Sequence, residues 1–126
     1  MVSIFGIDPV LMPVELCALQ SLRLWHDVHL GLVHRGGDLS SRQISILLTI
    51  YLEPPPHTVR GLAKKLYVTK PVITRALDTL GKLDLVSRRR DEADRRNVII
   101  QRTVAGALTV ERLGDMIMAR AKELPR

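Results

Sequence analysis

Residues 69–103, TKPVITRALDTLGKLDLVSRRRDEADRRNVIIQRT, constrain the fold of this chain more than any other stretch. They predict a short helix with a polar, basic outer face, followed directly by a hairpin whose tip is almost entirely charged. Two adjacent cationic elements suit a surface that contacts a polyanion in two places. Double-stranded DNA offers a major groove to the helix and an adjacent minor groove to the hairpin tip, so it is the expected partner.

The positive charge of the chain is concentrated in one third of its length. The net charge is +6; residues 60–103 contain twelve Lys or Arg and five Asp or Glu, whereas the other 82 residues contain seven and eight. Basic charge gathered in this way indicates phosphate binding. Aromatic residues make up 3% of the chain, which disfavours single-strand binding because that mode stacks bases on aromatic side chains.

The bulk composition predicts one globular domain, residues 1–126, in a reducing compartment. A hydrophobic fraction of 46% and a charged fraction of 25% are ordinary for a folded protein, and a single cysteine excludes an intramolecular disulfide. The apolar start MVSIFGIDPVLMP lacks the basic region of a signal peptide. No apolar run approaches the roughly 20 residues that span a bilayer. We therefore expect a cytoplasmic protein without a membrane partner.

Apolar periodicity predicts five helices and one hairpin, in the order α-α-α-α-β-β-α. The fold class is mainly α with a small β-hairpin. The first helix covers 14–34 and is ended by Gly36-Gly37; the second, capped by Ser40 or Ser41, covers 42–53; the third, capped by Thr58, runs to about Leu66. Thr69 caps the fourth, with Pro71 in its first turn. Strands are expected at 85–90 and 97–102, and Thr103 caps a last helix to about Leu124.

The inward faces of these helices follow from the spacing of their apolar residues. In the first helix the stripe is broad enough to predict burial against more than one neighbour; it comprises Leu16, Leu19, Leu22, Trp25, Val28 and Leu32. In the second helix the expected core positions are Ile44, Leu47, Leu48 and Tyr51. In the fourth helix Val72, Ile73, Ala76, Leu77 and Leu80 are expected inside, which leaves Lys70, Thr74, Arg75, Asp78 and Lys82 outside.

Two short helices joined by a tight turn and followed by a hairpin form a winged helix-turn-helix. From Leu39 to Thr103 the chain resembles the MarR family of bacterial transcription regulators. The segment VRGLAKKLYVTKPVITRALDTL is similar to that family's helix-turn-helix, and RRDEADRRNVIIQRT is similar to its wing signature, Asp-x-Arg followed by five residues and Leu-Thr. Here the signature reads Asp94, Arg95 and Arg96, then residues 97–101, then Arg102-Thr103.

The resemblance implies a homodimer that regulates a gene from a pseudopalindromic site. Residues 14–36 and 104–124 would form the dimer interface, and residues 39–103 would bind DNA. Thr69, Lys70, Thr74 and Arg75 would face the major groove, and Arg88, Arg89 and Arg90 would contact phosphates. Arg95 and Arg96 would lie at the wing tip, where Arg96 enters the minor groove and Asp94 holds its guanidinium by a charge-assisted hydrogen bond.

Three positions depart from the family pattern. Arg102 replaces the Leu of the wing signature, so the end of the second strand is polar. Asp84 replaces the Gly that follows the recognition helix, a change that Asp tolerates because it adopts left-handed backbone conformations more readily than most residues. A single helix stands at the C-terminus where the family tends to have two.

Other candidate sites have simpler structural interpretations. Some regulators of this kind sense peroxides through a cysteine, but the neighbours of Cys17 are mostly apolar, which favours a buried structural thiol. His26, His29 and His34 could form part of a metal site, yet four protein ligands are not evident. His57 is expected to be a loop residue. No nucleophile–base pair, glycine-rich phosphate loop or carboxylate pair indicates an enzyme, and neither a cofactor nor a metal is expected.

The sequence therefore predicts a dimeric, sequence-specific regulator that binds double-stranded DNA, with no particular small-molecule effector indicated. Two alternatives remain open at this stage. One is a DNA-coating or chromosome-organising protein of low sequence specificity, which would bind unrelated duplexes uniformly with a steep salt dependence. The other is a winged helix that docks a protein partner through its basic face.

Overall fold

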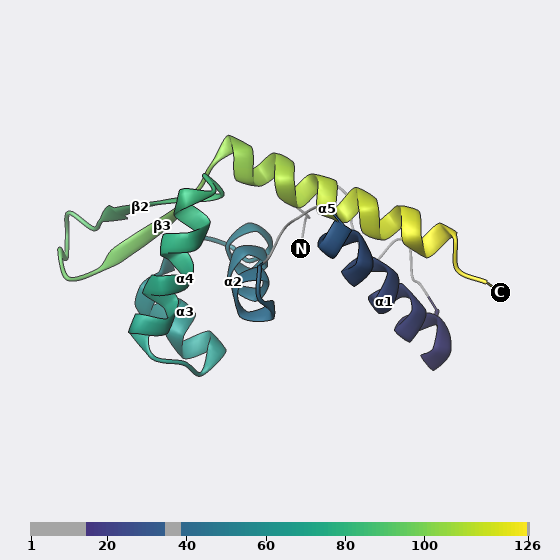
Figure 1. Cartoon of the computed structure of the whole chain (residues 1–126). Coiled ribbons are helices and arrows are strands. Elements are labelled where there is room, and N and C mark those ends of the chain that lie inside the picture. The colour runs from purple at the N-terminus through teal and green to yellow at the C-terminus, as the bar shows by residue number, and fades with distance from the viewer. Residues whose placement is uncertain (1–14, 35–38, 126) are drawn as a thin grey trace. The chain divides into compact units, whose positions relative to one another are not determined.

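The computed structural model describes residues 15–34 and 39–125, which form five helices and three short strands (Figure 1). The chain forms two compact units: Leu39–Val110, and α1 together with the part of α5 from Glu111 onward. The elements, in chain order, are α1 (Ala18–His34), α2 (Ser41–Leu52), β1 (His57–Thr58), α3 (Val59–Leu66), α4 (Lys70–Lys82), β2 (Val86–Arg90), β3 (Val98–Arg102) and α5 (Val104–Lys122).

This order confirms the predicted fold class and adds β1, which the sequence did not indicate. The sheet order is β1-β3-β2, with both pairs antiparallel. In β1, His57 pairs with Ile100 and Thr58 with Ile99. The prediction of His57 as a loop residue is wrong. Its side chain is buried, and its Nε2 lies 3.1 Å from the Glu53 carbonyl oxygen at the end of α2.

The helix starts in Leu39–Val110 agree with the capping residues in the sequence. Ser40 forms a capping box with Gln43, in which each residue's side chain accepts from the other's backbone N–H. Thr58 accepts from the Gly61 N–H, and Thr103 accepts from the Gly106 N–H. Thr69 occupies the N-cap position of α4 with an extended backbone, but its hydroxyl makes no capping hydrogen bond. That hydroxyl is exposed on the surface instead.

A single core holds this unit together, and all its members lie between α2 and the first turns of α5. It comprises Ile46, Leu47, Ile50, Tyr51, Leu62, Ala63, Ile73, Ala76, Leu77, Leu80, Leu85, Val86, Ile100 and Val110. In α4 the buried face is the predicted one. In α2 the prediction is confirmed for Leu47 and Tyr51, but it missed the fully buried Ile46 and Ile50, and Ile44 and Leu48 are only half-buried. The run ISILLTIYL is apolar on so many positions that its spacing did not define one face.

A buried tyrosine hydroxyl fastens the start of α5 to the start of β2. Tyr51 is fully buried, and its hydroxyl donates to the Leu85 carbonyl at 2.7 Å and accepts from the Thr103 N–H at 3.0 Å. The Thr103 hydroxyl donates to the Asp84 carbonyl at 2.7 Å. Gly106 lies against this node, where a Cβ would collide with the Tyr51 hydroxyl and the Leu85 carbonyl. These hydrogen bonds therefore fix the geometry at the base of the hairpin.

The second unit pairs α1 with the C-terminal part of α5. Val28 and Met116 are buried. The Met116 sulfur packs against Gly31, where a Cβ would lie only 2.5 Å from it. Gln20 donates through Nε2 to the Pro125 carbonyl at 3.1 Å. The helix begins at Ala18, so Glu15, Leu16 and Cys17 precede it; the expected start at Val14 and the stop at Gly36-Gly37 lie outside the described residues.

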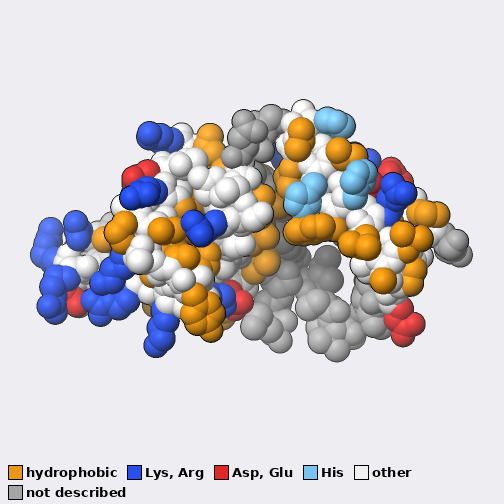
Figure 2. Space-filling model, turned by 60° about the horizontal axis from the view of Figure 1, so that its bottom comes forward, with side chains coloured by type: hydrophobic (Ala, Val, Ile, Leu, Met, Phe, Trp, Pro, Cys, Tyr) orange, Lys and Arg blue, Asp and Glu red, His pale blue; other side chains and the backbone are white. Residues whose placement is uncertain are grey.

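Much of the predicted inward stripe of α1 is exposed in the single chain. Leu19, Leu22 and Trp25 retain 74%, 65% and 65% of their surface. The expected burial against more than one neighbour is therefore not provided by the single chain. In Figure 2, pale-blue histidines lie among orange hydrophobic side chains on this part of the surface. Cys17 is also exposed, so the prediction of a buried thiol is wrong. The residue directly precedes α1, which begins at Ala18.

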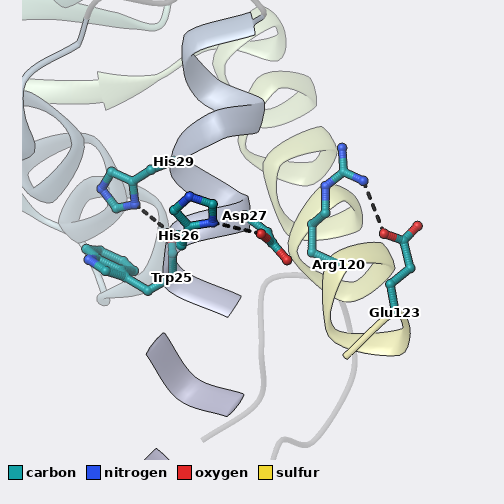
Figure 3. A network of polar contacts seen from close by, with 6 residues as sticks. All are labelled: Trp25, His26, Asp27, His29, Arg120 and Glu123. Atoms are coloured by element: carbon teal, nitrogen blue, oxygen red, sulfur yellow. Dashed lines mark hydrogen bonds and ion pairs between the residues drawn. The ribbon is translucent and has the colours of Figure 1, made fainter. Parts of the chain in front are cut away.

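The histidines of α1 make local contacts, drawn in Figure 3. His26 Nδ1 lies 3.0 Å from Asp27 Oδ1, and His29 Nδ1 lies 2.8 Å from the Trp25 carbonyl while its ring packs edge-on against Trp25. On α5, Arg120 pairs with Glu123 at 3.3 Å. Among the described residues, no three His, Cys, Asp or Glu side chains are placed to hold a metal ion.

Candidate nucleic-acid interface

The helix-turn-helix consists of α3, a turn at Tyr67 and Val68, and α4. Four side chains of α4 are buried in the core and orient the helix: Ile73, Ala76, Leu77 and Leu80. Because helix positions three or four residues apart share a face, this burial leaves the opposite face exposed. Lys70, Thr74, Arg75 and Asp78 are exposed there, as predicted from their spacing.

The turn contains a tyrosine in an unusual conformation. Tyr67 ends α3 with φ 56° and ψ 43°, in the left-handed region, and its side chain is 95% exposed. Its backbone N–H bonds to the end of α3, and the Val68 N–H donates to the Ala63 carbonyl at 3.0 Å. Val68 packs against the core. The turn is thus anchored, and the phenol projects from it into solvent.

The hairpin of β2 and β3 forms the wing, and its register is Arg88 opposite Ile100 and Arg90 opposite Val98. Arg88, Arg89 and Arg90 are all exposed. Arg88 Nη2 lies 2.8 Å from Asp78 Oδ1, an ion pair that joins the recognition helix to the wing. The sequence predicted the outward position of Asp78 on α4 but gave no sign of its contact with Arg88.

Two aspartates organise the wing tip. Asp91 Oδ1 accepts from the Ala93 N–H, and Asp94 Oδ1 accepts from the Arg96 N–H, so each closes a turn of the kind that Asp side chains favour. Asp94 Oδ1 also lies 3.3 Å from Arg96 Nε, the contact that the family resemblance implies. The Arg96 side chain is nevertheless 88% exposed. Arg90 donates to the Arg95 carbonyl at 3.2 Å, which further orders the loop.

Five of the ten site residues predicted from the sequence line two surface hollows. Thr74 and Arg88, Arg89 and Arg90 line one of about 380 Å³ with Val59 and Val98. Arg75 lines another of about 220 Å³ beside Arg42, at the first turn of α2. Figure 2 shows blue Lys and Arg side chains gathered at the end of this unit that carries the wing. Arg42 was not predicted as a member of the site, because its charge lies outside the basic segment.

Two of the departures from the family pattern, Asp84 and Arg102, have structural explanations. Asp84 adopts φ 59°, so the left-handed position expected there is occupied by an aspartate. Arg102 extends back to the end of α2, where Nε donates to the Ile50 carbonyl at 2.8 Å and Nη2 to the Glu53 carbonyl at 3.0 Å. Its guanidinium also lies 5.8 Å from the Tyr51 ring centroid. Arg102 therefore satisfies terminal carbonyls of a helix at a position where the family pattern has an apolar side chain.

The fold and this basic face define a winged helix-turn-helix protein of the DNA-binding class. A sequence model of the MarR family matches residues 39–98. The winged-helix unit of this chain belongs to the MarR family, whose members are transcription regulators, not enzymes. Among curated proteins, no sequence matches the chain significantly.

Solved structures agree with this assignment. Reduced AbfR bound to DNA shares 27% identity over 86% of this chain and 75% of its own, with a TM-score of 0.64. CouR bound to a DNA duplex shares 26% identity over 82% of this chain and 70% of its own, with a TM-score of 0.67. A mutant of MepR from S. aureus, at 22% identity over 86% and 81% with a TM-score of 0.70, shows likeness of fold alone. No helix among the described residues is long and apolar enough to cross a membrane.

Proposed function

We propose that this chain is a homodimeric transcription regulator that recognises a pseudopalindromic site in double-stranded DNA. The observation that carries the proposal is the combination of an exposed polar face on α4 with an ordered, arginine-tipped wing, in a unit that belongs to the MarR family. Related solved structures, AbfR and CouR, are described as bound to DNA. Residues 39–103 would bind DNA, and residues 14–36 and 104–124 would form the dimer. Regulation of a gene places the protein with the chromosome, in the cytoplasm.

The recognition helix supplies the major-groove contacts in this proposal. Lys70, Thr74 and Arg75 project from its exposed face, and the Thr69 hydroxyl, which makes no capping bond, is free to donate to a base edge or a phosphate. Arginine and lysine suit guanine edges in the major groove. Thr74 Oγ1 already donates to the Lys70 carbonyl at 3.1 Å, so its lone pairs remain available as acceptors.

The wing supplies the phosphate and minor-groove contacts. Arg96 is the most suitable side chain for a narrow minor groove, because Asp94 holds its Nε while 88% of the side chain stays exposed. Arg89 and Arg90 would meet phosphates. Arg88, held by Asp78, would contribute less free charge and would instead set the angle between helix and wing. Arg95, at the tip, would add electrostatic attraction.

The apolar surface of α1 supports a second copy of the chain as the dimer partner. Leu19, Leu22 and Trp25 are exposed and lie three residues apart, so they form a stripe along the helix. Contiguous apolar surface of this kind marks an interaction site. Two copies would present two recognition helices to half-sites about one helical turn, roughly 34 Å, apart. That symmetry matches a pseudopalindrome, since a two-fold protein reads a two-fold site.

The first experiment mixes the purified protein with sheared genomic DNA, retains the bound fragments at moderate salt and sequences them. A sharp pseudopalindromic motif supports the proposal. Uniform recovery of unrelated fragments indicates a DNA-coating protein instead, and no recovery leaves the basic face to a protein partner. Arg96→Ala is expected to weaken binding by about 1–3 kcal/mol and to relax preference at A·T-rich flanks. The matched control is Arg112→Ala, the same charge change on an exposed residue outside the DNA-binding segment. Because Arg112 lies in α5, sedimentation velocity first checks that this variant has the same mass as the native protein.

Sedimentation velocity tests the dimer separately. Leu22→Glu places a charge on a side chain that is 65% exposed in the single chain. If the stripe is covered by a second copy, the charge is buried without a partner and the variant becomes monomeric. Leu83→Glu, at a leucine that is 55% exposed after α4, is the control and should leave the mass unchanged. A dimer that survives Leu22→Glu would remove α1 from the interface.

A further inference from the structure

The turn between α3 and α4 carries a side chain that the fold does not need. Tyr67 has φ 56°, and a bulky residue in the left-handed region costs about 1–2 kcal/mol that glycine would avoid. Its side chain is 95% exposed, so burial does not compensate for this cost. The hydrogen bonds that close the turn come from the backbone. Glycine would therefore serve the turn better than tyrosine, and the phenol requires another explanation.

The position of Tyr67 indicates that explanation. It lies three residues before Lys70, the first residue of α4, and both Lys70 and the N-cap residue Thr69 are exposed. Lys64 and Lys65, in the last turn of α3, are also exposed, so cationic side chains flank the phenol on both sides in the chain. Val68 anchors the turn in the core, and the projecting phenol is therefore presented from a fixed backbone. A hydroxyl donor that projects from a fixed backbone between cationic side chains is suited to an anion.

We propose that the Tyr67 hydroxyl donates a hydrogen bond to a phosphate oxygen of the DNA backbone beside the major groove entered by α4. This inference rests on the proposed function and adds a contact to it. An O–H donor to an anionic oxygen forms a strong, short hydrogen bond, and tyrosine is among the side chains that bind DNA phosphates in this way. Such a contact fixes the register of the recognition helix on the duplex without reading sequence.

Three substitutions separate this role from a structural one. Tyr67→Phe removes only the hydroxyl and should weaken binding by about tenfold to 150-fold, the effect of one lost hydrogen bond to a charged group. Tyr67→Gly removes the whole side chain and relieves the backbone, so it should raise the melting temperature by a few degrees, about 3 °C, while weakening binding at least as much. Asp84→Gly, at the other left-handed position, φ 59°, is the control for backbone relief: it should stabilise less, because Asp tolerates this conformation, and it should not weaken binding.

The assay is fluorescence anisotropy with a labelled 30-base-pair duplex of arbitrary sequence, measured over a range of salt concentrations. A phosphate contact is independent of sequence, so no operator is needed. Tyrosine is neutral and releases no counterion; its loss should lower the affinity equally at every salt concentration. Arg96→Ala should in contrast reduce the slope of log affinity against log salt by about one.

The outcomes distinguish this inference from the proposed function. If the native chain binds and Tyr67→Phe binds equally well, the phosphate contact is refuted and the regulator proposal stands. If Tyr67→Gly alone is weakened, the ring matters and the hydroxyl does not, which also overturns the inference. If the native chain fails to bind any duplex at low salt, the proposed function and this contact fall together. Weakened binding by both Tyr67 variants, with a more stable Tyr67→Gly, supports the contact.

Discussion

The hydroxyl of Tyr51 gives the sharpest test of how the hairpin base is held. Tyr51→Phe removes one oxygen from a fully buried side chain and leaves the ring in place. The Leu85 carbonyl loses a donor at 2.7 Å, and the Thr103 N–H loses an acceptor at 3.0 Å. A buried group left unpaired costs about 1–3 kcal/mol, and the partly buried Thr103 N–H should cost about 1 kcal/mol, so we expect a loss of about 2–4 kcal/mol in the free energy of unfolding.

For a chain of this length each kcal/mol corresponds to roughly 3–5 °C, and the melting temperature should fall by about 10 °C. Circular dichroism melts at one fixed protein concentration measure it, because the melting temperature of a dimer depends on concentration. Tyr67→Phe, the same deletion on a 95% exposed ring, is the control and should change stability by less than about 0.5 kcal/mol. Equal melting temperatures for both variants would refute the reasoning, because they would mean that the buried hydroxyl contributes nothing.

Three further substitutions test neighbouring contacts. Asp94→Asn keeps an oxygen for the Arg96 N–H but loses the ion pair with the Arg96 side chain. We expect DNA binding to weaken by about 0.2–1 kcal/mol in anisotropy titrations. Tighter binding would show that Asp94 only repels phosphate. Arg102→Ala removes the side-chain donor of the Ile50 carbonyl, whereas the Glu53 carbonyl keeps its contact with His57 Nε2; stability should fall by about 1–2 kcal/mol in urea unfolding, and an unchanged midpoint would contradict this cap. Gly106→Ala should cost more than about 2 kcal/mol or prevent folding, whereas Gly81→Ala, with open space around it, should be neutral or stabilising.

Local rules predicted most of the DNA-binding unit. Caps at Ser40, Thr58 and Thr103 could be identified because an N-cap depends on residues within one helical turn. The exposed face of α4 followed from periodicity alone. The wing followed from strand propensity next to a charged loop, and the family resemblance supplied the pairing of Asp94 with Arg96.

What the sequence did not predict depends on contacts between distant residues. The strand at His57 and Thr58 exists because β3 pairs with it, and two residues after a proline run carry no strand signal of their own. Arg102 binds the end of α2 across about fifty residues of chain, which no local pattern reports. In α1 the spacing of Leu22 and Trp25 marked an apolar stripe correctly, but spacing does not reveal whether the partner belongs to the same chain.

The confinement of the core to α2 through the start of α5 makes Leu39–Val110 a transferable cassette. A relative's cassette grafted into this chain would bring its own operator preference, while the recipient's remaining residues would still choose the subunit with which it assembles. The junction at Val110 is sensitive to insertions, because α5 runs from Val104 to Lys122 and the cassette ends within this helix. One inserted residue there turns everything that follows by about 100° around the helix axis. Such a regulator would therefore tolerate an exchange of its DNA-binding segment far better than the insertion of one residue at this junction.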